Sequence, residues 1–144
     1  MSCAAGLVPE ENSAVETLCP NILQLTACAF LVPAAICVAQ GRLLGVIIHS
    51  SNAVCSTYVH RQDRTRTNDA YDILDHVLVF IWVGYNVYLL SFWPPLAVGA
   101  IACAVVVGAC KLGTLWLKYR TLPRYVFHSV MHISGTAGSI LLLV

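Results

Sequence analysis

The sequence predicts an all-α protein, a polytopic bundle of about five transmembrane helices that form one domain. Three observations lead to this fold class. Only 10% of the 144 residues are charged and 58% are hydrophobic, whereas a soluble domain carries about 25% charged residues. The apolar residues lie in runs of about 20, the length that crosses the hydrocarbon core of a bilayer. Charged or turn-forming residues separate these runs.

The chain divides into a short N-terminal segment, residues 1–20, and a single transmembrane domain, residues 21–144. Five spans are expected, at about residues 21–40, 43–60, 71–92, 96–117 and 124–144. We expect Pro33 to kink the first span, because proline has no N–H to donate. A glycine and an arginine at 41–42 leave room only for a tight turn into the second span. The Trp-Pro-Pro sequence at 93–95 predicts an interfacial turn, since tryptophan favours that depth and paired prolines break a helix.

The basic residues predict how the bundle is oriented. Six of them flank the ends of the second and fourth spans and the starts of the third and fifth: Arg61, Arg64, Arg66, Lys118, Arg120 and Arg124. With five spans all of these ends lie on one side of the membrane, and only Arg42 lies on the other. The positive-inside rule places the basic side, together with residues 1–20, in the cytoplasm. Spans of about 20 residues suit a thin bilayer, which favours the endoplasmic reticulum or Golgi over the plasma membrane.

Charge and cysteine content exclude two other classes of protein. A net charge of +1, without a basic stripe and aromatic platforms, predicts no nucleic acid partner. The seven cysteines include no CxxC pair, so neither a thiolate zinc site nor a disulfide framework is expected. Most of them lie inside apolar runs, where cysteine behaves as a small hydrophobic residue.

Histidines recur at span ends that the predicted topology places on the cytoplasmic side. The second span ends with Ser56 and His60, one helical turn apart and therefore on one helix face. His128 and His132 have the same spacing near the start of the fifth span. A charged or strongly polar side chain in the hydrocarbon costs about 2.5–3.5 kcal/mol on insertion scales, so such residues need partners. His132, the deepest of them, needs a partner most.

A zinc ion would be a suitable partner for these imidazoles. The histidine pair in the fifth span would offer two nitrogens to one ion, and His60 would complete a set of three. Three protein ligands and a water molecule are typical of a catalytic zinc site. No acid lies between the paired histidines, so Asp75 or Asp72, at the start of the third span, would have to orient or deprotonate the water. The Ser56 hydroxyl could bind the water or the forming oxyanion.

Structural roles compete with this interpretation at every position. The histidines could form interhelical hydrogen bonds, and Ser56 could bond back to its own helix. The two aspartates could be first-turn acids that the helix dipole favours. His49, about three turns from His60, is expected to be a hydrogen-bonded packing residue, and haem ligation is a less favoured alternative.

The order of these motifs resembles the alkaline ceramidase/adiponectin-receptor (CREST) superfamily of membrane proteins. Ser-x-x-x-His ends an early span, an aspartate opens the next, and His-x-x-x-His lies in the last span. The runs ILDHVLVFIWVGYNVYLL and RYVFHSVMHISGTAGSILLLV look like the corresponding spans of its myomaker-like branch. The resemblance implies a zinc ion that is held by three histidines: His60, His128 and His132. It also implies that Ser56 is the family's serine and that Asp75, with Asp72 as a rival, is its aspartate.

The resemblance implies an enzyme that hydrolyses the amide or ester bond of a membrane lipid. The superfamily core has seven spans, so a chain with about five would be a reduced form, and the loss of two helices keeps the motifs on one side. A smaller bundle would enclose a shallower lipid cavity unless the chain assembles as a homo-oligomer. The alternative is a non-enzymatic receptor, remodelling factor or scaffold in which the metal has a structural role.

Overall fold

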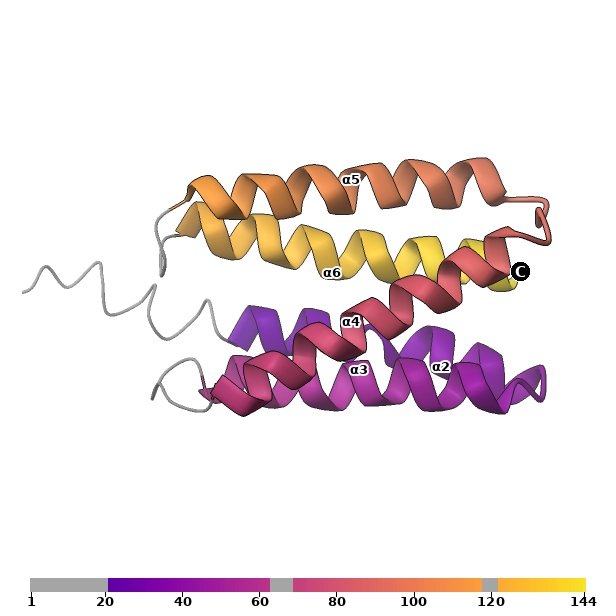
Figure 1. Cartoon of the computed structure of the whole chain (residues 1–144), viewed down its shortest axis with the longest axis horizontal. Coiled ribbons are helices and arrows are strands. Elements are labelled where there is room, and N and C mark those ends of the chain that lie inside the picture. The colour runs from indigo at the N-terminus through magenta and orange to yellow at the C-terminus, as the bar shows by residue number, and fades with distance from the viewer. Residues whose placement is uncertain (1–20, 63–68, 118–121) are drawn as a thin grey trace, which may run out of the picture.

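The structure is a bundle of α-helices that lie side by side along one axis (Figure 1). The computed structural model describes residues 21–62, 69–117 and 122–144, and at 62 and 69–72 it describes the backbone alone. Within these ranges every regular element is helical, which confirms the predicted all-α fold. The labelled helices are α2 (Leu31–Ala39), α3 (Leu43–Gln62), α4 (Asp69–Leu90), α5 (Ala97–Trp116) and α6 (Leu122–Leu143).

Four helical stretches of the described chain are long and apolar enough to cross a membrane: Asn21–Ala39, Ile73–Leu90, Ala97–Trp116 and Leu122–Leu143. The remaining predicted span corresponds to α3, which has 20 residues but is less apolar. Four of its polar side chains are buried in the bundle: His49, Asn52, Ser56 and His60. Its outer face carries exposed apolar side chains such as Leu44, Ile47 and Val54. This distribution suits a membrane bundle, since polar groups inside a membrane are tolerated where they face protein.

The first span is interrupted near Pro33, where the sequence predicts a kink. Residues 21–28 are helical, Ala29 and Phe30 form a turn, and α2 then begins at Leu31. At the interruption the Val32 N–H donates to the Ala29 carbonyl at 3.0 Å, a tighter pattern than in an α-helix. A proline ring clashes with the carbonyl four residues before it, which here belongs to Ala29. The break therefore follows from the position of the proline.

A glycine turn reverses the chain between α2 and α3. Gly41 has a φ of +67°, in the left-handed region that glycine adopts without strain. The Arg42 N–H donates to the Cys37 carbonyl at 2.9 Å, and the Gly41 N–H donates to the Val38 carbonyl at 3.1 Å. This pair of bonds is the usual way in which a glycine ends a helix. It makes the second span start at Leu43, next to the end of the first.

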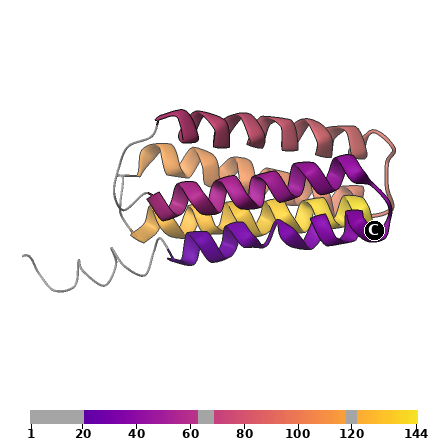
Figure 2. The ribbon, with the colours of Figure 1, turned by 90° about the horizontal axis from the view of Figure 1, so that it is seen from below.

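The helices form two groups that are connected through α2 and α4. Helices α5 and α6 pack as an antiparallel pair, and α3 packs on α2 and α4. Gly138 allows the first pair to approach closely, because an added Cβ would lie 3.1 Å from the Cβ of Cys103. Contacts between α2 and α6 connect the groups, whereas α3 itself barely approaches α6. Figure 2 shows α4 along one edge of the bundle, with α2 and α6 toward the opposite side.

Aromatic residues and a polar network fill the centre of the bundle. The ring of Trp82 in α4 packs edge-on against Phe30, with 5.6 Å between ring centroids. The Trp82 Nε1–H donates to the Ser139 hydroxyl at 3.1 Å, and that hydroxyl donates to Oδ1 of Asn86 at 2.9 Å. The network ties α4 to α6 and satisfies polar atoms that could find no water in a membrane.

The basic residues that the structure describes agree with the predicted distribution along the bundle axis. Arg61 lies in the last turn of α3 and Arg124 in the first turn of α6, at the same end of the bundle. Arg42 lies in the turn at the other end. The predicted cytoplasmic segment 1–20 lies outside the described residues, as do four of the basic residues used to predict the orientation: Arg64, Arg66, Lys118 and Arg120.

Candidate metal centre

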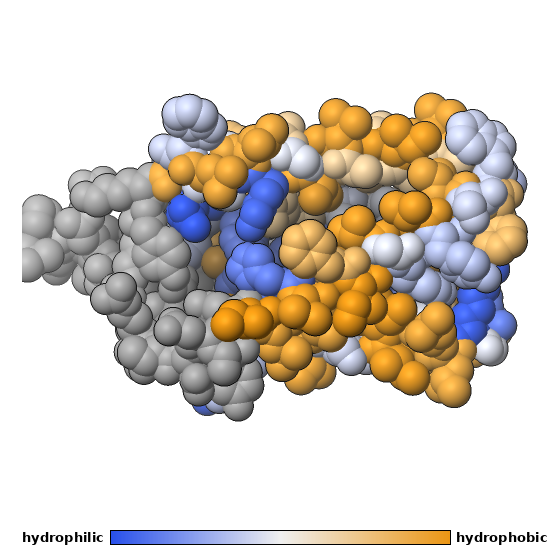
Figure 3. Space-filling view, in the orientation of Figure 1, coloured by the Kyte–Doolittle hydropathy of each residue, from blue (hydrophilic) through white to orange (hydrophobic). Residues whose placement is uncertain are grey.

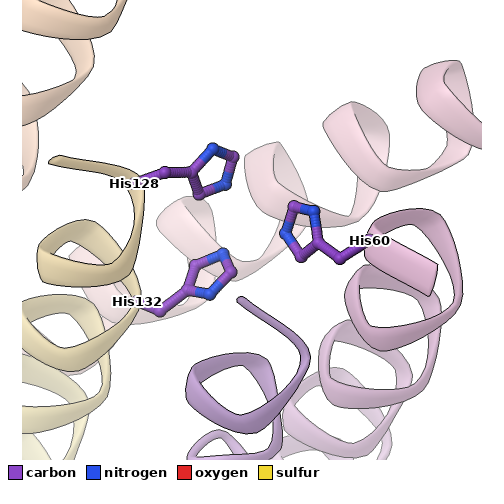
Figure 4. A group of neighbouring side chains, drawn as sticks. All are labelled: His60, His128 and His132. Carbon is purple, nitrogen blue, oxygen red and sulfur yellow. The ribbon is translucent and has the colours of Figure 1, made fainter. Parts of the chain in front are cut away.

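Three histidines from two helices meet at the end of the bundle where α3 ends and α6 begins (Figure 4). His60, His128 and His132 each offer a ring nitrogen, and these atoms all lie within 4.8 Å of one another. The ring centroid of His128 lies 4.8 Å from each of the other two, and those two are 5.2 Å apart. The sequence-predicted ligands are therefore brought together. Among the residues that the structure describes, no other such group of three or more His, Cys, Asp or Glu side chains is found.

The local sequence explains how each imidazole reaches the centre. His128 and His132 are four residues apart in α6, so both project from one face of that helix. His60 lies in the last turn of α3, opposite them. Because the two helices barely approach each other, their backbones leave room for the three rings. His60 and His132 are only 5% and 7% exposed, whereas His128 is half-buried.

The donor set can hold a metal ion. Imidazole nitrogens suit zinc, copper, iron and nickel, so the three ligands alone do not single out one metal. In a tetrahedral zinc site, Zn–N bonds of about 2.0–2.1 Å place the nitrogens about 3.3 Å apart. The observed limit of 4.8 Å is larger, so the imidazoles would have to turn inward to bind. Three protein ligands would leave one position open to water or a substrate.

Ser56 is buried beside the centre and contacts one of its histidines. Its Oγ lies 3.2 Å from Nε2 of His60, one turn further along α3. The shared helix face that the sequence predicts is thus confirmed. The hydroxyl is placed to hold the imidazole, which is a role that the sequence analysis did not assign to it.

The structure describes the two candidate aspartates to different extents. Asp75 is half-buried in α4, the helix that packs against α3. The backbone of Asp72 belongs to α4, but its side chain lies outside the described residues. Of the two aspartates, Asp75 is therefore the one whose side chain the structure describes.

His49 does not belong to the centre, and its surroundings differ in one respect from those that the sequence predicts. It is completely buried in α3, and its ring packs against Tyr85 with 5.8 Å between centroids. It was expected to be a hydrogen-bonded packing residue, but neither ring nitrogen has a hydrogen-bond partner in the described part of the chain. His49 packs as expected, and the expectation of hydrogen bonds is wrong.

Thr26 is a contact of the centre that the sequence analysis missed. It lies in the helical segment 21–28, and its Oγ1 is 3.1 Å from Nδ1 of His132. Phe30, one turn later, places its ring edge-on to the same imidazole, with 5.9 Å between centroids. A single threonine in an apolar span is only a weak indication of a functional contact. Its position one turn before Phe30 is the one feature of the sequence that could have indicated this contact.

No family model, curated protein or solved structure matches the chain. The candidate metal centre is therefore described from the chain's own residues. These are three clustered imidazoles and two hydroxyl groups, that of Ser56 beside His60 and that of Thr26 beside His132.

Proposed function

We propose that the chain is a zinc-dependent integral membrane hydrolase that cleaves the amide or ester bond of a lipid. The observation that carries the proposal is the cluster of three imidazoles from α3 and α6 in a bundle with four helices that are long and apolar enough to cross a membrane. Three neutral nitrogens with an open fourth position are the usual ligands of a hydrolytic zinc ion. The motif resemblance to the alkaline ceramidase/adiponectin-receptor superfamily supports the same function.

The depth of the cluster supports a lipid substrate. His60 lies in the last turn of its helix, and the other two histidines lie within the first three turns of α6. His60, at the end of its helix, lies closest to the membrane interface, where the amide or ester linkages of lipids are found, and His132 lies deeper, about 15 Å along α6 from Leu122. Figure 3 shows hydrophobic residues over much of the visible face, and hydrophilic residues recessed near the end of the bundle that holds the cluster. A lipid could reach such a recess without leaving the bilayer.

The residues around the centre suggest how the chain would take part in hydrolysis. A bound zinc ion would supply Lewis acidity, which polarises a carbonyl and activates a water molecule. Asp75 would accept the proton of the attacking water and return it to the leaving group. Ser56 would hold His60 in place through its hydroxyl. His128, the least buried ligand, marks the side from which the substrate would approach.

The test is metal analysis of the full chain purified in detergent, combined with incubation on a panel of ceramides and phospholipids. We expect about one equivalent of zinc per chain, which His128→Ala removes. Asp75→Asn should keep the zinc and lose the hydrolysis. His76→Ala is the matched control, because His76 is an exposed histidine of α4 outside the cluster. Absence of zinc from both the unmodified chain and His128→Ala would contradict the proposal.

A second candidate is a non-enzymatic receptor, remodelling factor or scaffold with a structural metal. The observation that favours it is that α3 and α6 pack only weakly against each other. An ion shared by histidines of both helices would hold the two helices together. In that case the chain would bind zinc and lose thermal stability when the metal is removed. No lipid product would form, and Asp75→Asn would leave the function intact. Product formation therefore separates the two candidates.

A further inference from the structure

The buried imidazole of His132 is held by a residue from the first span. Oγ1 of Thr26 lies 3.1 Å from Nδ1 of His132, although the two residues are 106 positions apart in the chain. The same hydroxyl oxygen lies 3.0 Å from the backbone carbonyl oxygen of Leu23. His132 is thus connected through a hydroxyl group to the backbone of the helical segment 21–28.

The two hydrogen bonds together fix where the protons are. A threonine hydroxyl has a single proton to donate, and a backbone carbonyl can only accept. Both bonds therefore form at once only if Thr26 donates to Leu23 and accepts from His132. In that arrangement Nδ1 of His132 carries a proton. Because a neutral imidazole carries one proton, Nε2 keeps its lone pair.

The surroundings of His132 make this preference strong. The side chain is 7% exposed, and the ring of Phe30 packs edge-on against it. Water therefore has little access to the Nδ1 proton, and a buried N–H without an acceptor is costly. In Figure 4 the imidazoles of the cluster turn toward one another, so the lone pair left on the His132 ring is available on the side of the other two histidines.

We infer that Thr26 is a positioning residue of the metal centre, which fixes His132 in the Nδ1–H tautomer and leaves Nε2 to bind the ion. The role of Thr26 in metal binding rests on the proposed function. The His132 tautomer, in contrast, can be measured in the metal-free chain. Histidines that bind metals usually donate their other ring N–H to an oxygen atom, and loss of that partner typically weakens metal binding by about 10–100-fold. Thr26 supplies this oxygen from a different helix.

The first experiment measures the tautomer directly. The full chain is labelled with ¹⁵N-histidine in detergent micelles, and the ring nitrogen shifts of His132 are recorded without metal. We expect the Nδ1–H tautomer in the unmodified chain and in Thr26→Ser, which keeps the hydroxyl. Thr26→Val, which has nearly the same shape without the hydroxyl, should lose the preference. A His132 tautomer that is the same in all three chains would overturn the inference.

The second experiment measures zinc affinity by competition with a chromogenic chelator. Thr26→Val should bind zinc about 10–100-fold more weakly, and Thr26→Ser should bind close to normally. The matched control is Thr57→Val, because the Thr57 hydroxyl contacts the sulfur of Cys28 at 3.6 Å and forms no hydrogen bond with the three histidines in the described structure. Helix content by circular dichroism shows whether each variant is folded, and Thr26→Ala provides a second hydroxyl-free variant if the valine does not fit.

These results separate the inference from the proposed function. A tautomer that depends on the Thr26 hydroxyl supports the inference even if the chain hydrolyses no lipid. An unchanged tautomer together with unchanged zinc affinity in Thr26→Val overturns it even if the chain is an active hydrolase.

Discussion

The hydroxyl of Ser56 lies 3.2 Å from Nε2 of His60, and both side chains are buried at the end of α3. If the hydroxyl accepts a hydrogen bond from Nε2–H, Nδ1 is the nitrogen of His60 that remains for a metal. We therefore expect Ser56→Ala to weaken zinc binding about tenfold, because His60 loses the oxygen that orients it. Chelator competition measures this change. A serine that acted only on the attacking water would instead lower the rate of hydrolysis and leave the zinc affinity unchanged.

Metal removal should destabilise the bundle, since the ion would join two helices that otherwise have little contact. A ligand present at 100 times its dissociation constant stabilises the folded state by about 2.7 kcal/mol. We expect the thermal midpoint in detergent to fall when zinc is removed with a chelator and to recover when zinc is restored. In His60→Ala the midpoint should no longer respond to zinc. A response that persists in this variant would show that the stabilising ion binds elsewhere.

The Ser139 hydroxyl should contribute more to stability than other hydroxyls of α6. Ser139→Ala leaves the Trp82 Nε1–H and Oδ1 of Asn86 without their partner. Buried polar groups that lose a partner cost about 1–3 kcal/mol each. Thr136→Val is the control, because the buried Thr136 hydroxyl has no hydrogen-bond partner in the described structure. Thermal unfolding should therefore show a clear loss for the first variant and little or no loss for the second.

Replacement of His49 should be tolerated. Its imidazole is fully buried, with no hydrogen bond to either nitrogen within the described chain. Because an apolar residue of similar size removes two unsatisfied polar atoms, we expect His49→Leu to be neutral or stabilising in thermal unfolding. Zinc content should be unchanged. A loss of more than about 2 kcal/mol would mean that the imidazole binds a water molecule or another polar group.

The orientation of the chain can be tested with glycosylation acceptors. Arg61 and Arg124 lie at one end of the bundle and Arg42 at the other, which by the positive-inside rule places the first end in the cytoplasm. We expect an acceptor loop inserted at Trp93 to be glycosylated in the endoplasmic reticulum. An acceptor at the N-terminus should remain unmodified. The opposite pattern would invert the topology and place the metal centre on the lumenal side.

The helices and the three histidines could be predicted from the sequence because their signals are local. Apolar runs of membrane length define the spans, and the spacing of four residues between His128 and His132 places both on one face. Two crossings, by the third and fourth spans, separate His60 from these histidines and therefore return the chain to the same end. These arguments need only the order and length of the helices, and the structure confirms that the three imidazoles meet.

The contacts of Thr26 and Ser139 could not be predicted in the same way. Thr26 meets His132 across 106 positions, and Ser139 meets Trp82 across 57. Such pairs depend on how far each helix is rotated and on the interruption before Pro33, neither of which a single apolar span reveals. The same limitation explains why the hydrogen bonding of His49 was wrongly predicted. The sequence shows a polar residue in a span, but whether it has a hydrogen-bond partner depends on every helix around it.

The wide separation of the candidate metal ligands along the chain has a consequence for biosynthesis. His60 belongs to the second span and His132 to the last, while Thr26 belongs to the first. During translation the cluster therefore cannot form until the last helix has entered the membrane and packed beside α2. Zinc uptake would be a late step of assembly, and a ribosome-bound chain that ends before α6 should not retain the ion. Bound metal would then report that the whole bundle has assembled.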